Sequence, residues 1–215
     1  CAKSIAKLLS IVFHFAHPMF SKLSCIPLTF LLFSMFLNAE DAVTVDRVKF
    51  KTLAERWVQV EIELTCNGNT NPEAANKDFV DNITVKPLLA YKTGDGSFNF
   101  YTSEVEIMIM EARDTNTVFF YMPGLVMERD ELRGDPEYYY IEIAVGGQVI
   151  EAKNGPALSS SIKGAAMLQN MQQKADEQAS RNKDILMPSY FAPAQLRGDS
   201  RKEPIYIRRE VQSGG

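Results

Sequence analysis

Histidine is almost absent from this chain of 215 residues, because its two copies, His14 and His17, both lie near the start. Residues 40–215 contain none. This stretch therefore lacks the base of Ser-His-Asp and Cys-His catalysis and the ligand that most zinc sites use. No cofactor motif stands out elsewhere in the sequence. We predict a protein with no cofactor, no metal site and no catalytic residues.

Cysteine is also scarce, since only Cys66 lies beyond the first 39 residues. A single cysteine cannot form an internal disulfide, although an exported protein meets an oxidising compartment. Cys66 ends an expected strand, and we place it on the polar face of that strand with Gln59, Glu61 and Glu63. No histidine or basic cluster lies nearby in the sequence, so a structural role is favoured over a reactive thiol.

The chain has no hydrophobic run of comfortable membrane-spanning length. The apolar run at 26–37 has twelve residues, whereas a spanning helix needs about 20. The first 39 residues carry three lysines, no acidic residue and a small residue, Ala39, at their end. We predict that 1–39 is a cleavable secretory leader, with Met19 as the true start. A second apolar run, 5–16, leaves open a two-segment membrane anchor.

Beyond the leader, basic residues are fewer than acidic residues. Residues 40–215 hold 20 basic and 27 acidic residues, which gives a net charge of −7. Nucleic acids and anionic membrane surfaces attract proteins that carry a basic footprint. We therefore predict no nucleic-acid partner and, after leader cleavage, no stable membrane span.

Alternation of apolar and polar residues is clearest in the stretch 57–64. The even positions from Val58 to Leu64 are aliphatic, and Gln59, Glu61 and Glu63 occupy the odd positions between them. Successive side chains of a strand point to opposite faces, whereas a helix would scatter these aliphatic residues around its circumference. The stretch predicts a strand of an antiparallel sheet with one buried face and one solvated face.

Similar patterns through residues 40–153 predict a mainly β domain, an antiparallel sandwich or barrel. A slip in the alternation between Val45 and Val48 indicates a bulge. Asp95-Gly96 and Gly146-Gly147 favour hairpins, with a type I′ turn at the first. Pro87 places its strand at a sheet edge, because proline cannot donate to the ladder. Further strands are expected at 42–51, 83–91, 98–112, 118–122, 138–145 and 148–152, and a charged loop at 128–136.

Residues 154–182 predict a C-terminal helix, with the hydroxyl groups of Ser159–Ser161 available for its N-cap. Its apolar residues recur at intervals of three and four and form one narrow stripe: Ile162, Ala165, Leu168, Met171 and Ala175. Such a stripe docks on another surface, and we expect it to pack on the sandwich, with a subunit contact as the alternative.

Residues 183–215 predict an extended tail, because prolines recur along it. The tail contains Tyr190, Phe191 and a last short strand at 205–207. An apolar tail of this kind is expected to lie on the sandwich or on a neighbouring subunit. In the strand at 98–112, Met108 and Met110 share a face with two glutamates, so something is expected to cover both methionines.

Three groups of residues have functional alternatives beside a structural interpretation. Aromatic side chains could form a platform for sugar rings, paired carboxylates could serve glycoside hydrolysis or bind calcium, and Arg-Gly-Asp triplets could serve adhesion. We favour the structural interpretation of each group: the tyrosines pack within the fold, the carboxylates are solvated, and the triplets are Gly-Asp turns. The groups are Tyr138, Tyr139 and Tyr140; Glu104/Glu106 and Glu128/Asp130/Glu131; and 133–135 and 197–199.

Several stretches together resemble a known family. They are the leader, the strand at 57–64, the strand end at 119–123 and the tail segment at 204–207. The chain resembles exported immunoglobulin-like β-sandwich proteins of type IV pilus-like loci in mucin-dwelling, Verrucomicrobia-type bacteria. The resemblance implies an immunoglobulin-like fold and a non-enzymatic part in a surface or pilus-associated assembly. A pilin retains its long N-terminal apolar helix, whereas this leader looks cleavable.

We therefore expect an exported, non-enzymatic structural or interaction protein of the bacterial cell envelope, in the periplasm, at the outer membrane or outside the cell. Its partners would be envelope or pilus-associated proteins, including a second copy of itself. The alternatives are a carbohydrate-binding or adhesion module and, less favoured, a carboxylate-based glycoside hydrolase. The candidate interaction residues are Tyr138, Tyr139, Tyr140, Met108, Met110, Leu168, Met171, Tyr190 and Phe191.

Overall fold

The computed structural model describes residues 41–151, 155–197 and 202–208, and the leader proposed at 1–39 lies outside them. The helices are α1 (Gly124–Arg129) and α2 (Ala165–Gln178), with 3-10 turns η1 (Ala54–Arg56), η2 (Ser189–Phe191) and η3 (Ala194–Leu196). Neither helix of the described part has the length and apolar character to cross a membrane. The strands are β1 (Val43–Thr52), β2 (Val58–Cys66), β3 (Phe79–Lys92), β4 (Phe98–Thr102), β5 (Val105–Glu111), β6 (Thr115–Met122), β7 (Tyr138–Val145), β8 (Gln148–Ile150), β9 (Met187–Pro188) and β10 (Tyr206–Ile207).

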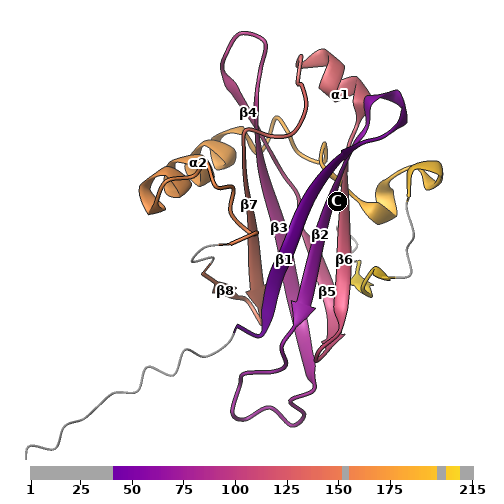
Figure 1. Ribbon diagram of the computed structural model, residues 1–215, viewed down its shortest axis with the longest axis vertical. Coiled ribbons are helices and arrows are strands. Elements are labelled where there is room, and N and C mark those ends of the chain that lie inside the picture. The colour runs from indigo at the N-terminus through magenta and orange to yellow at the C-terminus, as the bar shows by residue number, and fades with distance from the viewer. Residues whose placement is uncertain (1–40, 152–154, 198–201, 209–215) are drawn as a thin grey trace, which may run out of the picture. The chain divides into compact units, whose positions relative to one another are not determined.

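These strands form two antiparallel sheets that enclose the main core (Figure 1). Sheet one has the order β1-β2-β6-β9. Sheet two has the order β10-β5-β3-β7-β8, and β4 also pairs with β3. Buried apolar residues of β2 and β6 lie in one cluster with those of β3, β5 and β7. The mainly β, antiparallel and sandwich-like architecture predicted from the sequence is confirmed.

The alternation in β2 gives the two faces that were predicted. The four aliphatic positions from Val58 to Leu64 are buried. On the other face, Glu61 and Glu63 are partly exposed, and both pair with Arg47 of β1. The register of β1 with β2 shifts between Val45 and Arg47, which confirms the bulge. The two glutamates are therefore part of a solvated, charge-paired sheet face.

Pro87 lies in the central strand β3, so its expected edge position is wrong. β3 pairs with β7 on one side, and with β4 and then β5 in a single register on the other. The returning strand expected at 98–112 is thus interrupted at Ser103 and Glu104. The Ser103 amide donates to the Pro87 carbonyl (3.4 Å). The N–H and C=O groups of one strand residue point to the same neighbouring strand. Because the Pro87 carbonyl points to Ser103, the N–H that Pro87 lacks would also face this interruption, and no sheet hydrogen bond is lost there.

Met108 and Met110 do not share an environment, so the expected common cover is wrong. Met110 is 2% exposed in the main core, whereas Met108 is 47% exposed. The pairing of β3 with β5 skips Asn82 and Met108, and Asn82 has a left-handed φ of 53°. Asparagine tolerates this conformation. The irregularity reverses the alternation in both strands, and Met110 therefore faces inward.

The hairpin at Asp95-Gly96 joins β3 to β4 as predicted, but its turn is not type I′. Only Gly96 of the pair has a positive φ, 87°. The Thr93 amide donates to the Ser97 carbonyl (2.9 Å) and the Gly96 amide donates to the Thr93 carbonyl (2.9 Å). The Asp95 carboxylate accepts bonds from the Thr93 hydroxyl and from the Ser97 amide (3.0 Å) and hydroxyl (2.8 Å). A five-residue loop replaces the two-residue turn.

The Thr93 hydroxyl, followed by the Ser97 amide and hydroxyl, lowers the pKa of Asp95 to about 2. A depressed carboxyl pKa adds stability above the unfolded value of 3.8, and this stability is lost as the pH falls through about 2. We expect a carbon-13 NMR titration of the Asp95 carboxyl group to have its midpoint near 2, and Thr93→Val to raise that midpoint. A midpoint near 3.8 in both proteins would contradict this loop geometry.

The short helix α1 was not predicted, and its last two residues overlap the charged loop expected at 128–136. Its first residue, Gly124, is so close to η1 that an added Cβ would lie 1.8 Å from the Glu55 carbonyl oxygen. Met127 and Leu132 anchor the segment in the main core. Six residues are too few for helical periodicity to be recognised, so the sequence pattern missed this helix.

α2 begins at Ala165, and Ser159–Ser161 do not cap it. Its N-cap is Gly164, which has no side chain to cap the helix. The residues before it instead extend along β7: the Ile141 amide donates to the Ala157 carbonyl (2.8 Å), and the Ser159 amide donates to the Tyr139 carbonyl (3.0 Å). The open backbone groups of β7 therefore override the capping preference of the serines.

The helix α2 lies on the outer face of sheet two (Figure 1). Its apolar stripe packs there as predicted, although Ala165 is exposed. The Gln178 side chain binds the β4 backbone in both directions, accepting from the Phe100 amide (3.0 Å) and donating to the Phe98 carbonyl (3.1 Å). The Asn182 amide donates to the Phe100 carbonyl (2.7 Å). The buried cluster beneath α2 contains Leu88, Ala90, Phe100, Tyr140, Ile162, Met171 and Ala175.

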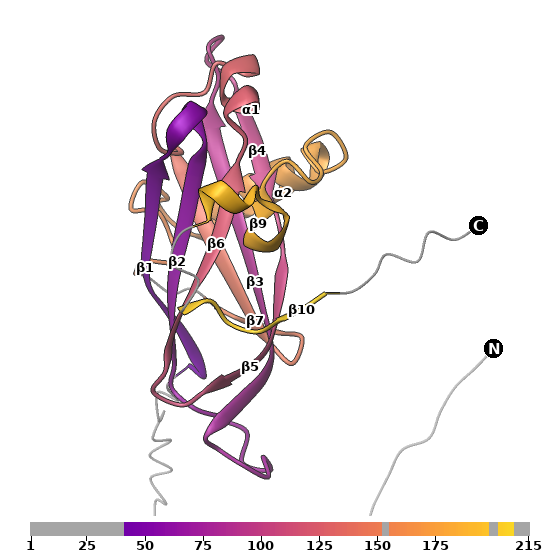
Figure 2. The same cartoon turned by 90° about the vertical axis from the view of Figure 1, so that its right-hand side faces the viewer.

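The described tail segments lie on the sandwich, as predicted (Figure 2). β9 pairs with β6 at one edge of sheet one, and β10 pairs with β5 at one edge of sheet two. Between them, Ala192 and Leu196 pack beside Phe119 and Tyr121 on the outer face of sheet one. The tail therefore completes one edge of each sheet.

Two residues of β2 are placed differently from the prediction. Gln59 is only 4% exposed, and its amide donates to the Tyr121 hydroxyl (2.7 Å), because Tyr121 and the tail cover this end of the outer face. Cys66 lies in the main core and not on the polar face, since residue 66 shares the parity of Leu64. Burial raises the pKa of its thiol, in keeping with a structural role.

Candidate functional site

Apolar side chains remain exposed where the tail passes from one sheet to the other. Phe191 is 70% exposed and Ile205 is 61% exposed. The Tyr190 ring lies 4.7 Å from that of Phe191 and 5.4 Å from that of Tyr206, and the Ile205 carbonyl accepts a bond from the Met108 amide (2.8 Å). We call Met108, Tyr190, Phe191 and Ile205 the tail surface.

Basic side chains hold the tail surface in place. The Arg197 guanidinium donates to the carbonyls of Tyr190 (3.1 Å) and Ala192 (2.9 Å). The Arg208 guanidinium lies 4.8 Å from the centre of the Tyr190 ring, in the range of a cation–π interaction. Exposed apolar residues with a polar rim are typical of protein contact sites. Tyr190, Phe191 and Met108 were singled out in the sequence, whereas Ile205 was missed as a site residue.

Other predicted interaction residues contribute to packing. Met110 lies in the main core, and Met171 is buried beneath α2. Leu168 is partly buried against the same cluster beneath α2. These three side chains stabilise the described fold, which leaves little of them for contact with another molecule.

Tyr138, Tyr139 and Tyr140 do not form an aromatic platform, because they alternate across β7. Tyr139 packs against the main core, with its ring 5.4 Å from that of Phe50. Tyr138 and Tyr140 lie on the opposite face, in the cluster beneath α2. An aromatic platform needs its rings on one face, so the interpretation of this triplet as a sugar platform is wrong.

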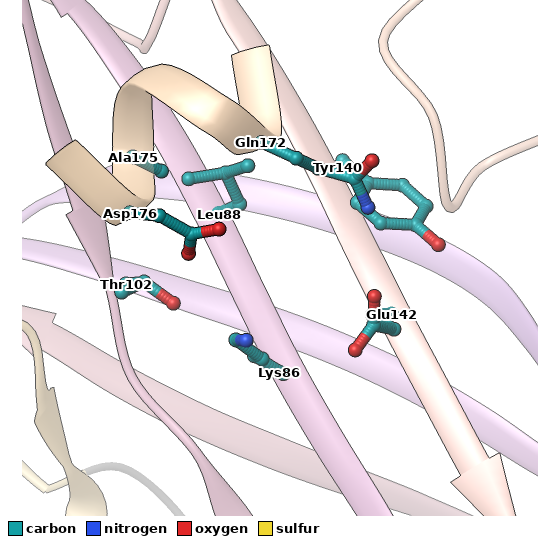
Figure 3. A pocket seen from close by; sticks show the side chains of 8 residues that line it. All are labelled: Lys86, Leu88, Thr102, Tyr140, Glu142, Gln172, Ala175 and Asp176. Atoms are coloured by element: carbon teal, nitrogen blue, oxygen red, sulfur yellow. The ribbon is translucent and has the colours of Figure 1, made fainter. Parts of the chain in front are cut away.

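A pocket of about 290 Å³ lies between α2 and the outer face of sheet two (Figure 3). Lys86 of β3 and Glu142 of β7 are direct partners in the sheet. Burial, with the charges of Glu142 and Glu151, raises the pKa of the Tyr140 phenol, so this group stays protonated. The Thr102 hydroxyl is buried and has no hydrogen-bond partner among the described residues. The lining residues are Lys86, Leu88, Thr102, Tyr140, Glu142, Gln172, Ala175 and Asp176.

The acidic cluster Glu128/Asp130/Glu131, at the end of α1, has a structural role through Asp130. This carboxylate accepts bonds from the Arg129 guanidinium (2.7 Å) and the Tyr101 hydroxyl (2.6 Å). The Arg129 bond lowers the pKa of Asp130, and burial raises that of Tyr101. Within the described residues, no group of three His, Cys, Asp or Glu side chains could hold a metal ion. Gly134, in the first Arg-Gly-Asp triplet, has a φ of 63°, as expected of a turn.

Comparison with known proteins supports the fold and goes no further. No family model and no curated protein matches this chain. A crystal structure of a protein from Akkermansia muciniphila is similar, with a TM-score of 0.53 and 14% sequence identity. The match covers 78% of this chain and 93% of that one. Akkermansia muciniphila is one of the Verrucomicrobia, the bacterial group that the sequence resemblance indicated. The chain thus shares its fold with a protein of that group.

Proposed function

We propose that this protein is an exported, non-enzymatic component of the bacterial cell envelope that contributes to a surface or pilus-like assembly. The tail surface is the observation that supports the proposal. Burying Phe191 and Ile205 against a partner would remove two largely exposed apolar side chains from water. Each large apolar side chain that becomes fully buried contributes about 1.5–3 kcal/mol.

The position of the tail surface favours a rigid contact. Main-chain pairing of β9 and β10 fixes the tail to both sheets, so little conformational entropy is lost when a partner binds.

An immunoglobulin-like sandwich is the finer fold that we propose. Its partners are envelope or pilus-associated proteins, and a second copy of this chain is the first to test. The leader-like segment at 1–39 supports export to the periplasm, the outer membrane or the cell exterior.

Light scattering during size-exclusion chromatography tests the assembly. We expect a mass above that of one chain, and we expect Phe191→Ser with Ile205→Ser to shift the protein toward the monomer. Val149→Ser is the matched control, because Val149 is also exposed but lies on β8, at the opposite edge of sheet two. Mass spectrometry of the same sample reads the N-terminus, where cleavage after Ala39 is expected.

Two results would contradict the proposal. One is a strict monomer that binds no envelope component. The other is a retained apolar run at 26–37, which would favour the anchor over a cleaved leader.

A further inference from the structure

The pocket beneath α2 brings charged groups of both signs together without pairing them. Lys86 and Glu142 are direct neighbours across β3 and β7, and Asp176 reaches the same space from α2 (Figure 3). None of the three forms an ion pair with another described residue. Lone charges at the wall of a pocket are available as hydrogen-bonding groups for a ligand.

The lining also offers both donors and acceptors at close range. Lys86 is a pure donor, and the two carboxylates are pure acceptors. Gln172 and Thr102 can donate and accept, and the Thr102 hydroxyl has no partner among the described residues. A ligand that satisfies this set must itself donate and accept at several positions, which is the property of neighbouring hydroxyl groups.

Charge narrows the class of ligand. A small anion would face two carboxylates, Glu142 and Asp176, and a metal cation would face the Lys86 ammonium group. A neutral polyol meets neither repulsion. The remaining wall is apolar, formed by Leu88, Ala175 and the Tyr140 ring. A sugar ring combines an apolar C–H face with a rim of hydroxyl groups, and both parts have a counterpart here.

The size of the pocket fits one such ring. Its volume of about 290 Å³ corresponds to roughly ten water molecules at the density of the liquid. We propose that this pocket binds one neutral sugar ring, either a free monosaccharide or the end residue of a glycan. The pocket is separate from the tail surface, so this proposal does not depend on the proposed assembly.

Nitrogen-15 NMR of the purified protein tests the site directly. The probes are glucose, galactose, mannose and N-acetylglucosamine, followed by the disaccharides lactose and chitobiose. We expect amide shifts confined to 86, 88, 102, 140–142 and 172–176, with affinity in the millimolar range. Shifts with the monosaccharides indicate a free-sugar site, and shifts with the disaccharides alone indicate the end of a glycan.

Asp176→Ala is expected to weaken the binding about tenfold, the effect of losing one hydrogen bond to a charged group. Glu177→Ala is the matched control, because this adjacent carboxylate is exposed like Asp176 but does not line the pocket, and it bonds only Gln173 of the same helix in the described structure. The wild-type shift map stands by itself if a variant fails to fold.

Three results would overturn the proposal. The first is no shift with any of the six sugars, and the second is a set of shifts outside the pocket. The third is a stronger response to inorganic phosphate or acetate than to the sugars, which would make the pocket an anion site.

Discussion

Gly124→Ala is expected to lower the free energy of unfolding by about 3 kcal/mol, the upper end of the range for overpacking. Its methyl group would lie 1.8 Å from the Glu55 carbonyl oxygen and 3.1 Å from the Arg56 carbonyl carbon. Both are backbone atoms, so no side-chain rotation relieves the overlap, and η1 or α1 must move. Denaturant unfolding followed by the fluorescence of Trp57, the single tryptophan, measures the change.

Leu125→Ala is the control for this prediction. Leu125 is the next residue of α1 and is 81% exposed, so its truncation is expected to change the free energy of unfolding by no more than about 0.5 kcal/mol. Equal, small effects of the two substitutions would show that α1 and η1 do not meet through their backbones.

Truncation of Phe120 to alanine is expected to cost about 3–5 kcal/mol of unfolding free energy. Phe120 is fully buried in β6, which pairs with β2 on one side and β9 on the other, and its side chain lies in the main core between the sheets. The loss is large beside the total stability of a domain, about 5–15 kcal/mol. Thermal unfolding by circular dichroism measures it as a lower Tm.

Phe191→Ala removes the same atoms at an exposed position and is the matched control. The unfolding free energy is expected to stay within about 0.5 kcal/mol of the wild type. The same variant should weaken assembly through the tail surface, so stability and association separate in one substitution. If Phe120→Ala were as mild as Phe191→Ala, the core between the two sheets would be placed wrongly.

The sequence pattern identified part of the tail surface and missed the pocket. Tyr190 and Phe191 were identified because large aromatic side chains in a proline-interrupted tail are expected to contact another surface. Ile205 did not, because its exposure depends on how β10 lies on β5. The pocket draws its polar residues from the β3–β4 hairpin, from β7 and from α2, three segments that are far apart in the chain. No local pattern marks residues that only folding brings together.

Local errors in the prediction have local causes. Pro87 was assigned to an edge by a rule that ignores which neighbour its missing N–H would face. The serines before α2 fit an N-cap by composition, yet the free side of β7 uses that segment. Cys66 needed no structure to be placed correctly, since it continues the alternation of Leu64. Met110 could be placed only with the structure, because the irregularity at the left-handed Asn82 reverses the alternation in both β3 and β5.

The sequence by itself determined most of the strands, most of the turns, the docking stripe of α2 and the buried face of β2. These follow from side-chain periodicity, which is a property of neighbouring residues. Only the tertiary structure decided what covers the outer faces of the sheets. The tail buries Gln59 and leaves Phe191 exposed, and α2 covers Tyr140 while leaving a pocket beside it. Periodicity shows which side chains share a face, but contacts between distant segments decide which faces remain open to a partner.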